Sequence, residues 1–256
     1  MSASSETEAT TRICTSDADS ITLRGKDLVE DVIGRYSITG AFLLQALGEE
    51  PSREQIALLD AVMVTIMEHG LMPSVIATRL TLTGAPESLQ GAVAAGLLGV
   101  GDRYGGTAGK CGALAERLLA AGDLDAEAER VVAEHRSARQ PLPGFGHPIH
   151  KGRDPRTQKL LDMLPPESGA RASMEALEHA LSIALGKPLV MNVSAALAAL
   201  MVEARVPAGM MRGVILVART AGLVGHVLEE QTNPIGDVLW HGAAEAVEYV
   251  EGDGQC

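Results

Sequence analysis

The sequence predicts an all-α protein, and its composition and punctuation are the reasons. Hydrophobic residues fill 46% of the 256 positions, whereas aromatic residues fill only 2%. A core must therefore be built from Ala, Leu, Val, Ile and Met, whose short or unbranched side chains let helices approach closely. Gly, Pro and Ser divide the chain at helix-length intervals, and no alternating run longer than ITLRG at residues 21–25 indicates a strand.

Local start and stop signals place the expected helices in order along the chain. Ser52 and Gln55 form a capping box at the start of a helix that we expect to end at His69. Asp154 followed by Pro is typical of an N-cap and first helical position, so Arg156 should lie in the first turn of a helix that runs to about residue 164. Further helices are expected at 86–98, 107–121, 125–139, 168–185, 188–205, 208–221 and 223–231.

Charge, cysteine spacing and hydropathy narrow the functional class. A formal net charge of -12 argues against nucleic-acid binding, which needs a basic surface. Cys14, Cys111 and Cys256 show no paired spacing, which is typical of a cytoplasmic protein. Residues 1–20 are polar, so we expect a disordered tail and no signal peptide. No apolar run reaches the roughly 18 residues of a membrane span, so no membrane association is expected.

The stretch PGFGHPIHKGRDPR, residues 143–156, concentrates positive charge in an acidic chain. Gly144 and Gly146 are expected to expose backbone N–H groups. His147 offers a proton-transfer group with a reference pKa near 6.5, and Arg156 offers a bidentate fork for a carboxylate. Each residue taken singly is more often a surface charge or a satisfied core group. Their combination predicts a site for a carboxylate-bearing substrate.

Two more specific motifs are excluded by spacing. In GVGDRYGGTAGKCG, residues 99–112, Tyr104 occupies the place of a required Gly in both nucleotide-binding patterns, and Cys111 replaces the Ser or Thr of a phosphate loop. A tight glycine-lined helix crossing is the simpler interpretation. His147 and His150 have no acidic or Cys partner at ligand spacing, so no metal site is expected.

Two residues outside this stretch are candidates for ligand binding. His69 at the end of its predicted helix is ambiguous, because a His there often only complements the helix dipole. Arg219, within VILVARTAG, is more informative, because an Arg in an apolar helix is unfavourable unless an anion pairs with it. We therefore expect Arg219 to have an anionic partner, either from the protein or from a ligand.

Six segments, taken in chain order, resemble motifs of the citrate synthase superfamily. They are ITLRGKDL at 21–28, EHGLMPS at 68–74, GDRYGG at 101–106, PGFGHPIHKGRDPR at 143–156, NVSAA at 192–196 and VARTAGLVGH at 217–226. The resemblance is closest to the citryl-CoA lyases and to the citryl-CoA lyase module of ATP-citrate lyase. His147 and Arg156 keep the nine-residue separation of the family motif, and the collinear match runs from about residue 20 to about residue 230.

The resemblance implies a citrate synthase-like multi-helix fold over residues 21–256. A large subdomain and a small subdomain, at roughly 113–205, would enclose the active site, and the chain would form a homodimer or homotetramer. The implied activity is that of a citryl-CoA lyase, which cleaves or forms the C–C bond of a 3-hydroxyacyl-CoA such as citryl-CoA. Acetyl-CoA and the oxo acid oxaloacetate would be the other reactants. Coenzyme A would enter as a thioester substrate, with no tightly bound cofactor and no metal.

The same resemblance implies roles for individual residues. Those with catalytic roles would be His147, His69, Tyr104 and Ser194. Those that bind the oxo acid or carboxylates would be His69, Arg156, Arg219, His241 and Arg103. Those at the coenzyme A site would be Pro143, Gly144, Phe145, Gly146 and Lys151. In the lyase direction the first of the catalytic residues, His147, would accept the hydroxyl proton as the C–C bond breaks.

Three positions depart from the synthase pattern. Tyr104 stands where the synthases have an enol-stabilising His, and the lyases have Phe or Tyr there, so this change favours the lyase branch. Ser194 occupies the place of the catalytic Asp, and a hydroxyl without an activating base cannot transfer an α-carbon proton near neutral pH. His241 lies nearest the expected place of another carboxylate-binding Arg. If a different carboxylate acts as the base, Asp102 is the first candidate.

These departures leave alternative functions open. A different acyl-CoA lyase or a thioesterase could use the same scaffold, with Ser194 holding water or substrate. A non-catalytic CoA-ester-binding protein is the third possibility, although the retention of Arg219 in an apolar helix favours an enzyme.

Overall fold

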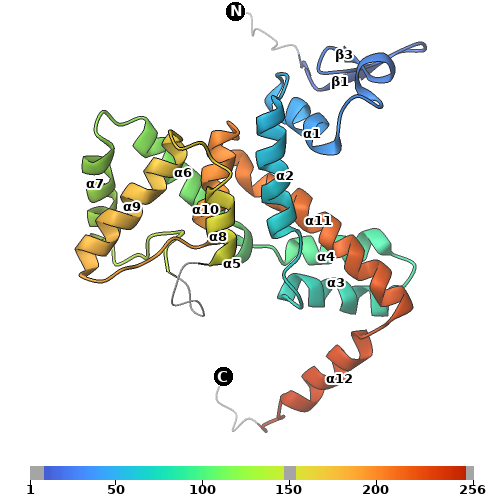
Figure 1. Cartoon of the computed structure of the whole chain (residues 1–256). Helices are drawn as coiled ribbons and strands as arrows, with labels where there is room; N and C mark the ends of the chain where they lie inside the picture. Colours follow the sequence, from blue (N-terminus) through green and yellow to red (C-terminus); the bar gives the residue numbers. More distant parts are fainter. Residues whose placement is uncertain (1–8, 147–153, 252–256) are drawn as a thin grey trace, which may run out of the picture. The chain divides into compact units, whose positions relative to one another are not determined.

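The computed structural model describes residues 9–146 and 154–251 (Figure 1). The chain is 65% helical with little strand, which confirms the predicted all-α class. His147, His150 and Lys151 lie outside the described residues. The chain divides into two compact units, Met1–Asp60 and Ala61–Cys256, and each is described by itself. This division does not test the predicted small subdomain at 113–205, which stays a prediction.

The first unit begins with a small antiparallel sheet. Its strands are β1 (Cys14–Ser16), β2 (Ile21–Leu23) and β3 (Lys26–Asp27), in the order β1-β2-β3. Strand β1 lies within the predicted polar tail, where its residues pair with β2 in the register Cys14↔Leu23. All three residues of β1 are exposed, so no hydrophobic alternation marked the strand in the sequence.

Helical elements complete the first unit. A π-helical turn, η1 (Leu28–Val32), and helix α1 (Ile38–Leu47) follow the sheet, and α2 (Arg53–Met67) begins in this unit and ends in the second. The predicted capping box is confirmed, because the Ser52 N–H donates to Gln55 Oε1 at 2.8 Å and the Gln55 N–H donates to Ser52 Oγ at 3.2 Å. Helix α2 ends at Met67, two residues before the predicted end.

The second unit is built from helices. They are α3 (Pro73–Gly84), α4 (Leu89–Leu98), α5 (Asp102–Gly105), α6 (Thr107–Leu119), α7 (Leu124–Ser137), α8 (Pro155–Leu161), α9 (Gly169–Leu185), α10 (Val193–Glu203), α11 (Ala208–Thr232) and α12 (Gly236–Ala246). The expected helices from 86 to 185 lie where the sequence predicted them, whereas α1, α3, α5 and α12 were not predicted. Helix α10 starts five residues later than predicted, because the segment before it pairs with the loop at Phe145.

The predicted break between 221 and 223 is wrong, since α11 is one continuous helix. Gly222 lies within it, and a Cβ at this position would overlap the backbone carbonyl oxygen of Met67. This glycine therefore allows the end of α2 to approach α11 closely and does not end a helix. The sequence shows the glycine but not the neighbour that requires it.

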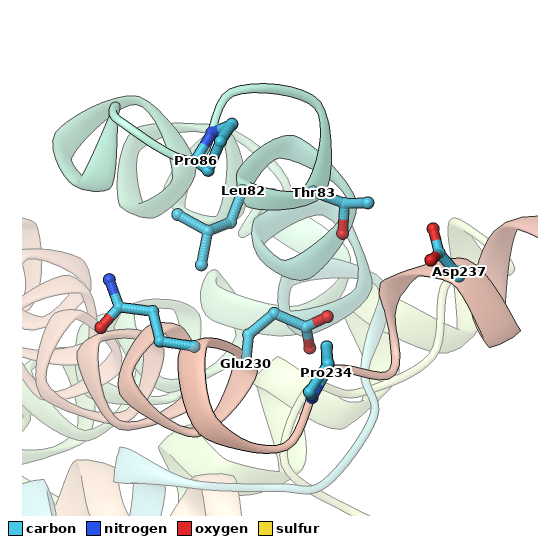
Figure 2. Close-up of a pocket in the computed structure, with 7 residues that line it drawn as sticks. Leu82, Thr83, Pro86, Glu230, Pro234 and Asp237 are labelled. Carbon is cyan, nitrogen blue, oxygen red and sulfur yellow. The ribbon is translucent and has the colours of Figure 1, made fainter.

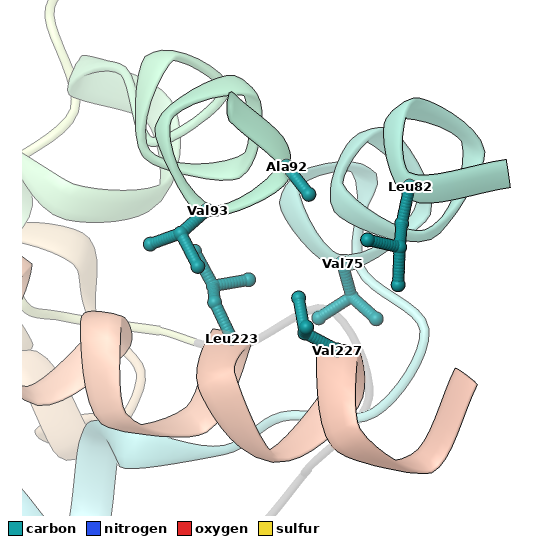
Figure 3. Packing of buried hydrophobic residues seen from close by; sticks show 6 residues of the cluster. All are labelled: Val75, Leu82, Ala92, Val93, Leu223 and Val227. Carbon is teal, nitrogen blue, oxygen red and sulfur yellow. The ribbon is translucent and has the colours of Figure 1, made fainter. Parts of the chain in front are cut away.

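Two buried regions form the core of this unit. Between α3, α4 and α11 lie Val75, Leu82, Ala92, Val93, Leu223 and Val227 (Figure 3). Helix α10 is the second buried element, and each residue from Ala195 to Met201 is at most 1% exposed. Its small side chains let α6, α8 and α9 pack against it. The core is thus built from aliphatic residues, as the low aromatic content predicted.

Helix α11 is long and apolar enough to cross a membrane by length and composition alone. Its most apolar 18-residue window has a mean hydropathy of 1.3, and 44% of that window is buried within the protein. The helix packs against α3, α4 and α6, which is typical of a core helix in a globular fold. The expectation from sequence that no segment spans a membrane stays a prediction.

Candidate active site

One face of α11 organises the candidate site. Residues 212, 215, 219, 222, 226 and 230 follow each other at intervals of three or four, so they lie along one side of the helix. Arg212 Nη1 donates to Asp102 Oδ1 of α5 at 2.8 Å, and Gly222 lies against the end of α2. Arg219 lies between these two contacts, so the GDRYGG segment and the EHG turn both adjoin its face of the helix.

Arg219 is buried in an apolar helix, and the anionic partner that the sequence predicts for it stays a prediction. The residue is 6% exposed and forms no hydrogen bond or ion pair with any other residue that the structure describes. Burial lowers the pKa of its guanidinium, and the carboxylate of Glu68 partly opposes this effect. A buried guanidinium without a hydrogen-bond partner is unfavourable, and a bound anion would remove this penalty. The site therefore suits a ligand carboxylate.

The turn after α2 carries His69 and lies against α11 near Gly222. Glu68 Oε1 accepts the N–H groups of His69 and Gly70 at 2.8 and 2.6 Å, and Gly70 adopts a positive φ of 67°. These contacts end the helix earlier than predicted and leave the His69 side chain exposed. Burial acts to raise the pKa of Glu68, but the hydrogen bonds from His226 and from this turn lower it below its ordinary value. Glu68 is therefore ionised near neutral pH.

The GDRYGG segment forms the short helix α5, and its last residue, Gly106, is the N-cap of α6. Tyr104 is 42% exposed, and the guanidinium carbon of Arg103 lies 5.5 Å from its ring centroid. Asp102 pairs with Arg212 and lies 3.5 Å from Lys110 Nζ. Because two cations contact this exposed carboxylate, the structure offers no support for Asp102 as a replacement base.

Two glycines of the longer stretch at 99–112 support the interpretation of that stretch as a close helix crossing. A Cβ at Gly112 would overlap the sulfur of Met211, and one at Gly109 would come within 3.3 Å of the Ala208 carbonyl oxygen. Helices α6 and α11 therefore cross closely here. Among residues 9–146 and 154–251, no three metal-ligating side chains gather in one place.

The loop at 143–146 is pinned to the start of α10. The Gly146 N–H donates to the Val190 carbonyl at 2.9 Å, and the Asn192 N–H donates to the Gly144 carbonyl at 2.9 Å. The Asn192 side chain donates to the Gly146 carbonyl at 3.0 Å and accepts the Ser194 N–H at 2.9 Å. The expectation that Gly146 exposes its N–H is therefore wrong, because that group is used within the fold.

Close packing explains the glycine at the start of this loop. Gly144 has a φ of 89°, and a Cβ there would lie 2.6 Å from Cys111 Sγ and 3.0 Å from the Ala195 Cβ. Phe145 forms an isolated bridge with Met191. The structure thus brings Pro143 to Gly146 together with Ser194, and no hydrogen bond or ion pair among the described residues links this group directly to Arg219.

Arg156 lies in the first turn of α8, as predicted. Asp154 caps the helix by accepting the Arg156 N–H at 2.9 Å, and it also pairs with the guanidinium, with Nη2 at 2.7 Å from Oδ2. The hydrogen bond with Asp154 raises the pKa of Arg156. The arginine side chain is 40% exposed, and its hydrogen bonds to the Asp154 carboxylate come from Nε and Nη2. A ligand carboxylate would therefore share this guanidinium with Asp154.

His241 lies apart from these residues. It is on α12, is exposed and stacks on Trp240 with ring centroids 5.0 Å apart. Within the described chain, α12 packs mainly on α3. The proposed binding role of His241 therefore stays a prediction.

A charged cluster near the EHG turn was not predicted. It contains the buried Arg79 and Glu230 together with His226 and the partly exposed Glu68, and it joins α3, α11 and the turn after α2. The only local signal was that two polar residues, His226 and Glu230, lie four apart on the inward face of the apolar helix α11. Their partners are more than 140 residues away in sequence, which is why periodicity alone could not find them.

A family model described as citrate synthase, C-terminal domain, matches residues 9–237. The chain belongs to the citrate synthase family. This result confirms the resemblance on which the fold prediction relied, and the fold agrees. Citryl-CoA lyase from Hydrogenobacter thermophilus superposes with a TM-score of 0.84 and is 29% identical, over 97% of this chain and 96% of that one.

Other relatives are more distant or longer. ATP citrate lyase from Methanothrix soehngenii, solved with citrate and coenzyme A, has a TM-score of 0.79 at 22% identity, covering 98% of this chain and 43% of that one, and shows the fold alone. A Mycobacterium tuberculosis protein with the provisional name citrate synthase 2 is 29% identical over 204 residues, which is 76% of this chain and 52% of that protein. The chain spans about half the length of the curated relatives it matches.

Proposed function

We propose that this chain is a citryl-CoA lyase-like enzyme. It would cleave or form the C–C bond of a 3-hydroxyacyl-CoA such as citryl-CoA, with acetyl-CoA and oxaloacetate as the other reactants. The observation that carries the proposal is Arg219, a buried guanidinium without a hydrogen bond or ion pair in the described structure. The similarity to a citryl-CoA lyase over nearly the full length of both chains supports the same reaction class.

In this proposal the carboxylates and the thioester are held by different parts of the chain. Arg219 and Arg156 would bind the carboxylates of the substrate, and His69 would contact the substrate oxygen atoms that lie between those carboxylates. In the lyase direction His147 would take the proton of the substrate hydroxyl group. The carbon that bears this hydroxyl would then become the carbonyl carbon of oxaloacetate. The electron pair of the broken C–C bond would pass to the α-carbon of the acetyl thioester, which then needs a proton.

An open groove beside the loop suits the coenzyme A portion. The groove has a volume of about 650 Å³, and Pro143 lines it together with Lys110 and His135. The Lys110 ammonium and the His135 ring nitrogens are hydrogen-bonding groups that would suit the phosphates of coenzyme A. Gly144 follows Pro143 and is bonded to the segment before Ser194, so a thioester lying along the loop would point toward α10.

A second candidate function follows from Ser194. Among the described residues no acid or base side chain forms a hydrogen bond with its hydroxyl group. The proton for the α-carbon therefore has no evident donor at this position. A thioesterase or a CoA-ester-binding protein would need no such donor, whereas a different acyl-CoA lyase would have to take this proton from another group.

One assay separates these functions. The protein is incubated with citryl-CoA and with a small panel of other 3-hydroxyacyl-CoAs, while acetyl-CoA, free CoA and oxo acid are followed separately. Equal amounts of acetyl-CoA and oxaloacetate support the lyase. Free CoA released without an oxo acid indicates a thioesterase. Binding of every ester without any turnover would contradict both enzymes and support the binding protein.

We also propose that the chain is a cytoplasmic homodimer or homotetramer. Helix α12 exposes Val238 and Trp240 at 70% and 61%, and such apolar side chains suit a subunit interface. A monomer in light scattering at micromolar concentration would contradict the oligomer.

A further inference from the structure

The unpredicted charged cluster is centred on Arg79 of α3. Its side chain is 2% exposed, although it carries a full charge. Arg79 Nη1 donates to Glu230 Oε2 at 2.6 Å, and Nε and Nη2 lie 3.1 and 2.8 Å from His226 Nδ1. Glu229 also contacts the guanidinium. Arg79 thus contacts three residues of α11, which are His226, Glu229 and Glu230.

These contacts determine the tautomer of His226. An arginine side chain can only donate hydrogen bonds, so Nδ1 of His226 must be the acceptor and carries no proton. The ring proton is then on Nε2, which donates to Glu68 Oε2 at 2.9 Å. His226 is therefore a neutral bridge that accepts from Arg79 on one side and donates to Glu68 on the other.

The far end of this chain of contacts is anchored at the start of α12. Glu230 Oε1 accepts the N–H groups of Ile235 and Gly236 at 2.9 and 2.6 Å. A Cβ at Gly236 would overlap the hydroxyl of Thr83, so the turn also packs tightly on α3. Figure 2 shows Glu230 and Thr83 at this junction, around a small pocket that Asp237 also lines. Glu230 uses both oxygen atoms, which leaves Arg79 little freedom to move.

The near end is the EHG turn of the candidate active site. Glu68 accepts from His226 with one oxygen and from the N–H groups of His69 and Gly70 with the other. The same carboxylate is the charge that acts on the unpaired Arg219. A shift of Glu68 would therefore move His69 and change the electrostatic environment of Arg219 together.

We propose that His226 is a positioning residue for the carboxylate site. It holds Glu68 in the orientation that accepts the N–H groups of His69 and Gly70, and Arg79 and Glu230 hold His226 in turn. This inference rests on the proposed function, since the ligand is the oxo acid expected there. His226 does not touch substrate in this scheme, because it acts through Glu68.

The test compares two substitutions of His226. His226→Gln keeps one acceptor and one donor, whereas His226→Leu removes both. His179→Leu, on the exposed surface of α9, is the control for loss of a histidine. Oxaloacetate and acetyl-CoA affinities are measured by calorimetry, and amide hydrogen exchange is followed at residues 67–72 without ligand.

We expect His226→Leu to weaken oxaloacetate binding about tenfold to a hundredfold, since hydrogen bonds to a charged group are lost, while acetyl-CoA affinity stays within twofold. The His69 and Gly70 amides should exchange at least about tenfold faster. His226→Gln should recover most of both effects, and His179→Leu should show neither. Nitrogen chemical shifts of the wild-type protein should show the Nε2–H tautomer at His226.

Three results would overturn the proposal. The first is unchanged exchange at His69 and Gly70 in His226→Leu. The second is an equal loss of both affinities together with faster exchange throughout α3 and α4, because the cluster would then serve only stability. The third is a His226→Gln variant no better than His226→Leu. If the wild-type protein binds no oxaloacetate, the proposed function fails, and the exchange data still decide whether His226 positions the turn.

Discussion

The inward face of α11 and the start of α10 both adjoin the candidate site, but they carry different kinds of side chain. Helix α11 carries Arg219 and His226 in buried surroundings, where charged and polar groups are unfavourable without partners. Helix α10 offers only Asn192 and Ser194 before a run of fully buried small and aliphatic residues. The difference indicates that anion binding and proton transfer are separable in this chain. The residues proposed to bind the anion lie among the described residues, whereas the start of α10 offers no acid or base for the proposed proton transfer.

The first expected effect comes from giving the start of α10 the carboxylate that it lacks. Ser194→Asp places a carboxylate in the first turn of the helix, where the dipole favours it. We expect the wild-type protein to exchange the α-protons of acetyl-CoA very slowly and Ser194→Asp to exchange them about 100-fold faster or more, measured as deuterium uptake by mass spectrometry. Ser194→Asn is the control of matched size without a base. Rapid uptake by the wild-type protein would contradict the comparison and direct attention to another carboxylate.

The second effect comes from removing the charge from α11. Arg219→Met should weaken oxaloacetate binding by about 2 to 5 kcal/mol and leave CoA affinity nearly unchanged, as measured by calorimetry. Arg212→Met lies two turns away on the same face and removes the same charge, but from a 46% exposed ion pair, so its effect should be below about 1 kcal/mol. Equal losses of both ligands in Arg219→Met would mean that the fold was damaged.

The third effect concerns the approach of the EHG turn to α11. Gly222→Ala introduces a Cβ against the carbonyl oxygen of Met67, so it should lower the free energy of unfolding by about 1 to 3 kcal/mol. Gly213→Ala in the same helix meets no atom within 4 Å and should raise stability by up to about 1 kcal/mol. Urea unfolding of both variants checks the prediction. Similar changes in both would show that α2 does not press on Gly222.

The smallest effect is the pH dependence that Glu68 contributes. Its pKa is lower in the folded protein than its ordinary value, so its contribution to stability is present above about pH 4.5 and is lost as the pH falls through the folded pKa. The carboxylate is 47% exposed, so we expect only a fraction of a kcal/mol. The stability difference between wild type and Glu68→Gln should therefore shrink as the pH is lowered from 6 to 3. A difference that grows with acidity would show that Glu68 is not stabilised as an anion.

Sequence reasoning succeeded where the signal was local. The capping box at Ser52 and the N-cap at Asp154 each involve residues two or three apart, and both are present. Arg219 was recognised as a buried candidate for ligand binding because the residues next to it in sequence are apolar. In each case the residues that decide the structure lie within one helical turn.

Sequence reasoning failed where the deciding partner is distant. Gly222 was interpreted as a helix end, because nothing in the local sequence shows that α2 packs on it. The contacts of Arg79 with α11 join residues 147 and 151 positions apart, and periodicity contains no information on such pairs. The N–H of Gly146 was expected to face a ligand, but it donates to the carbonyl oxygen of Val190, which is distant in sequence.

The packing of Gly144 against Cys111 gives the protein an internal chemical reporter. Burial raises the pKa of Cys111 to about 12, so at pH 8 only about one molecule in ten thousand would carry the reactive thiolate, and the thiol lies beneath the loop. The exposed Cys14 would react with a thiol reagent at once. Slow labelling of Cys111 would then measure how often the loop lifts from α6 and α10, and a ligand that closes over Pro143 should slow it. The rate of Cys111 alkylation would thus measure how often the loop at 143–146, which we propose binds the thioester, moves away from α6 and α10.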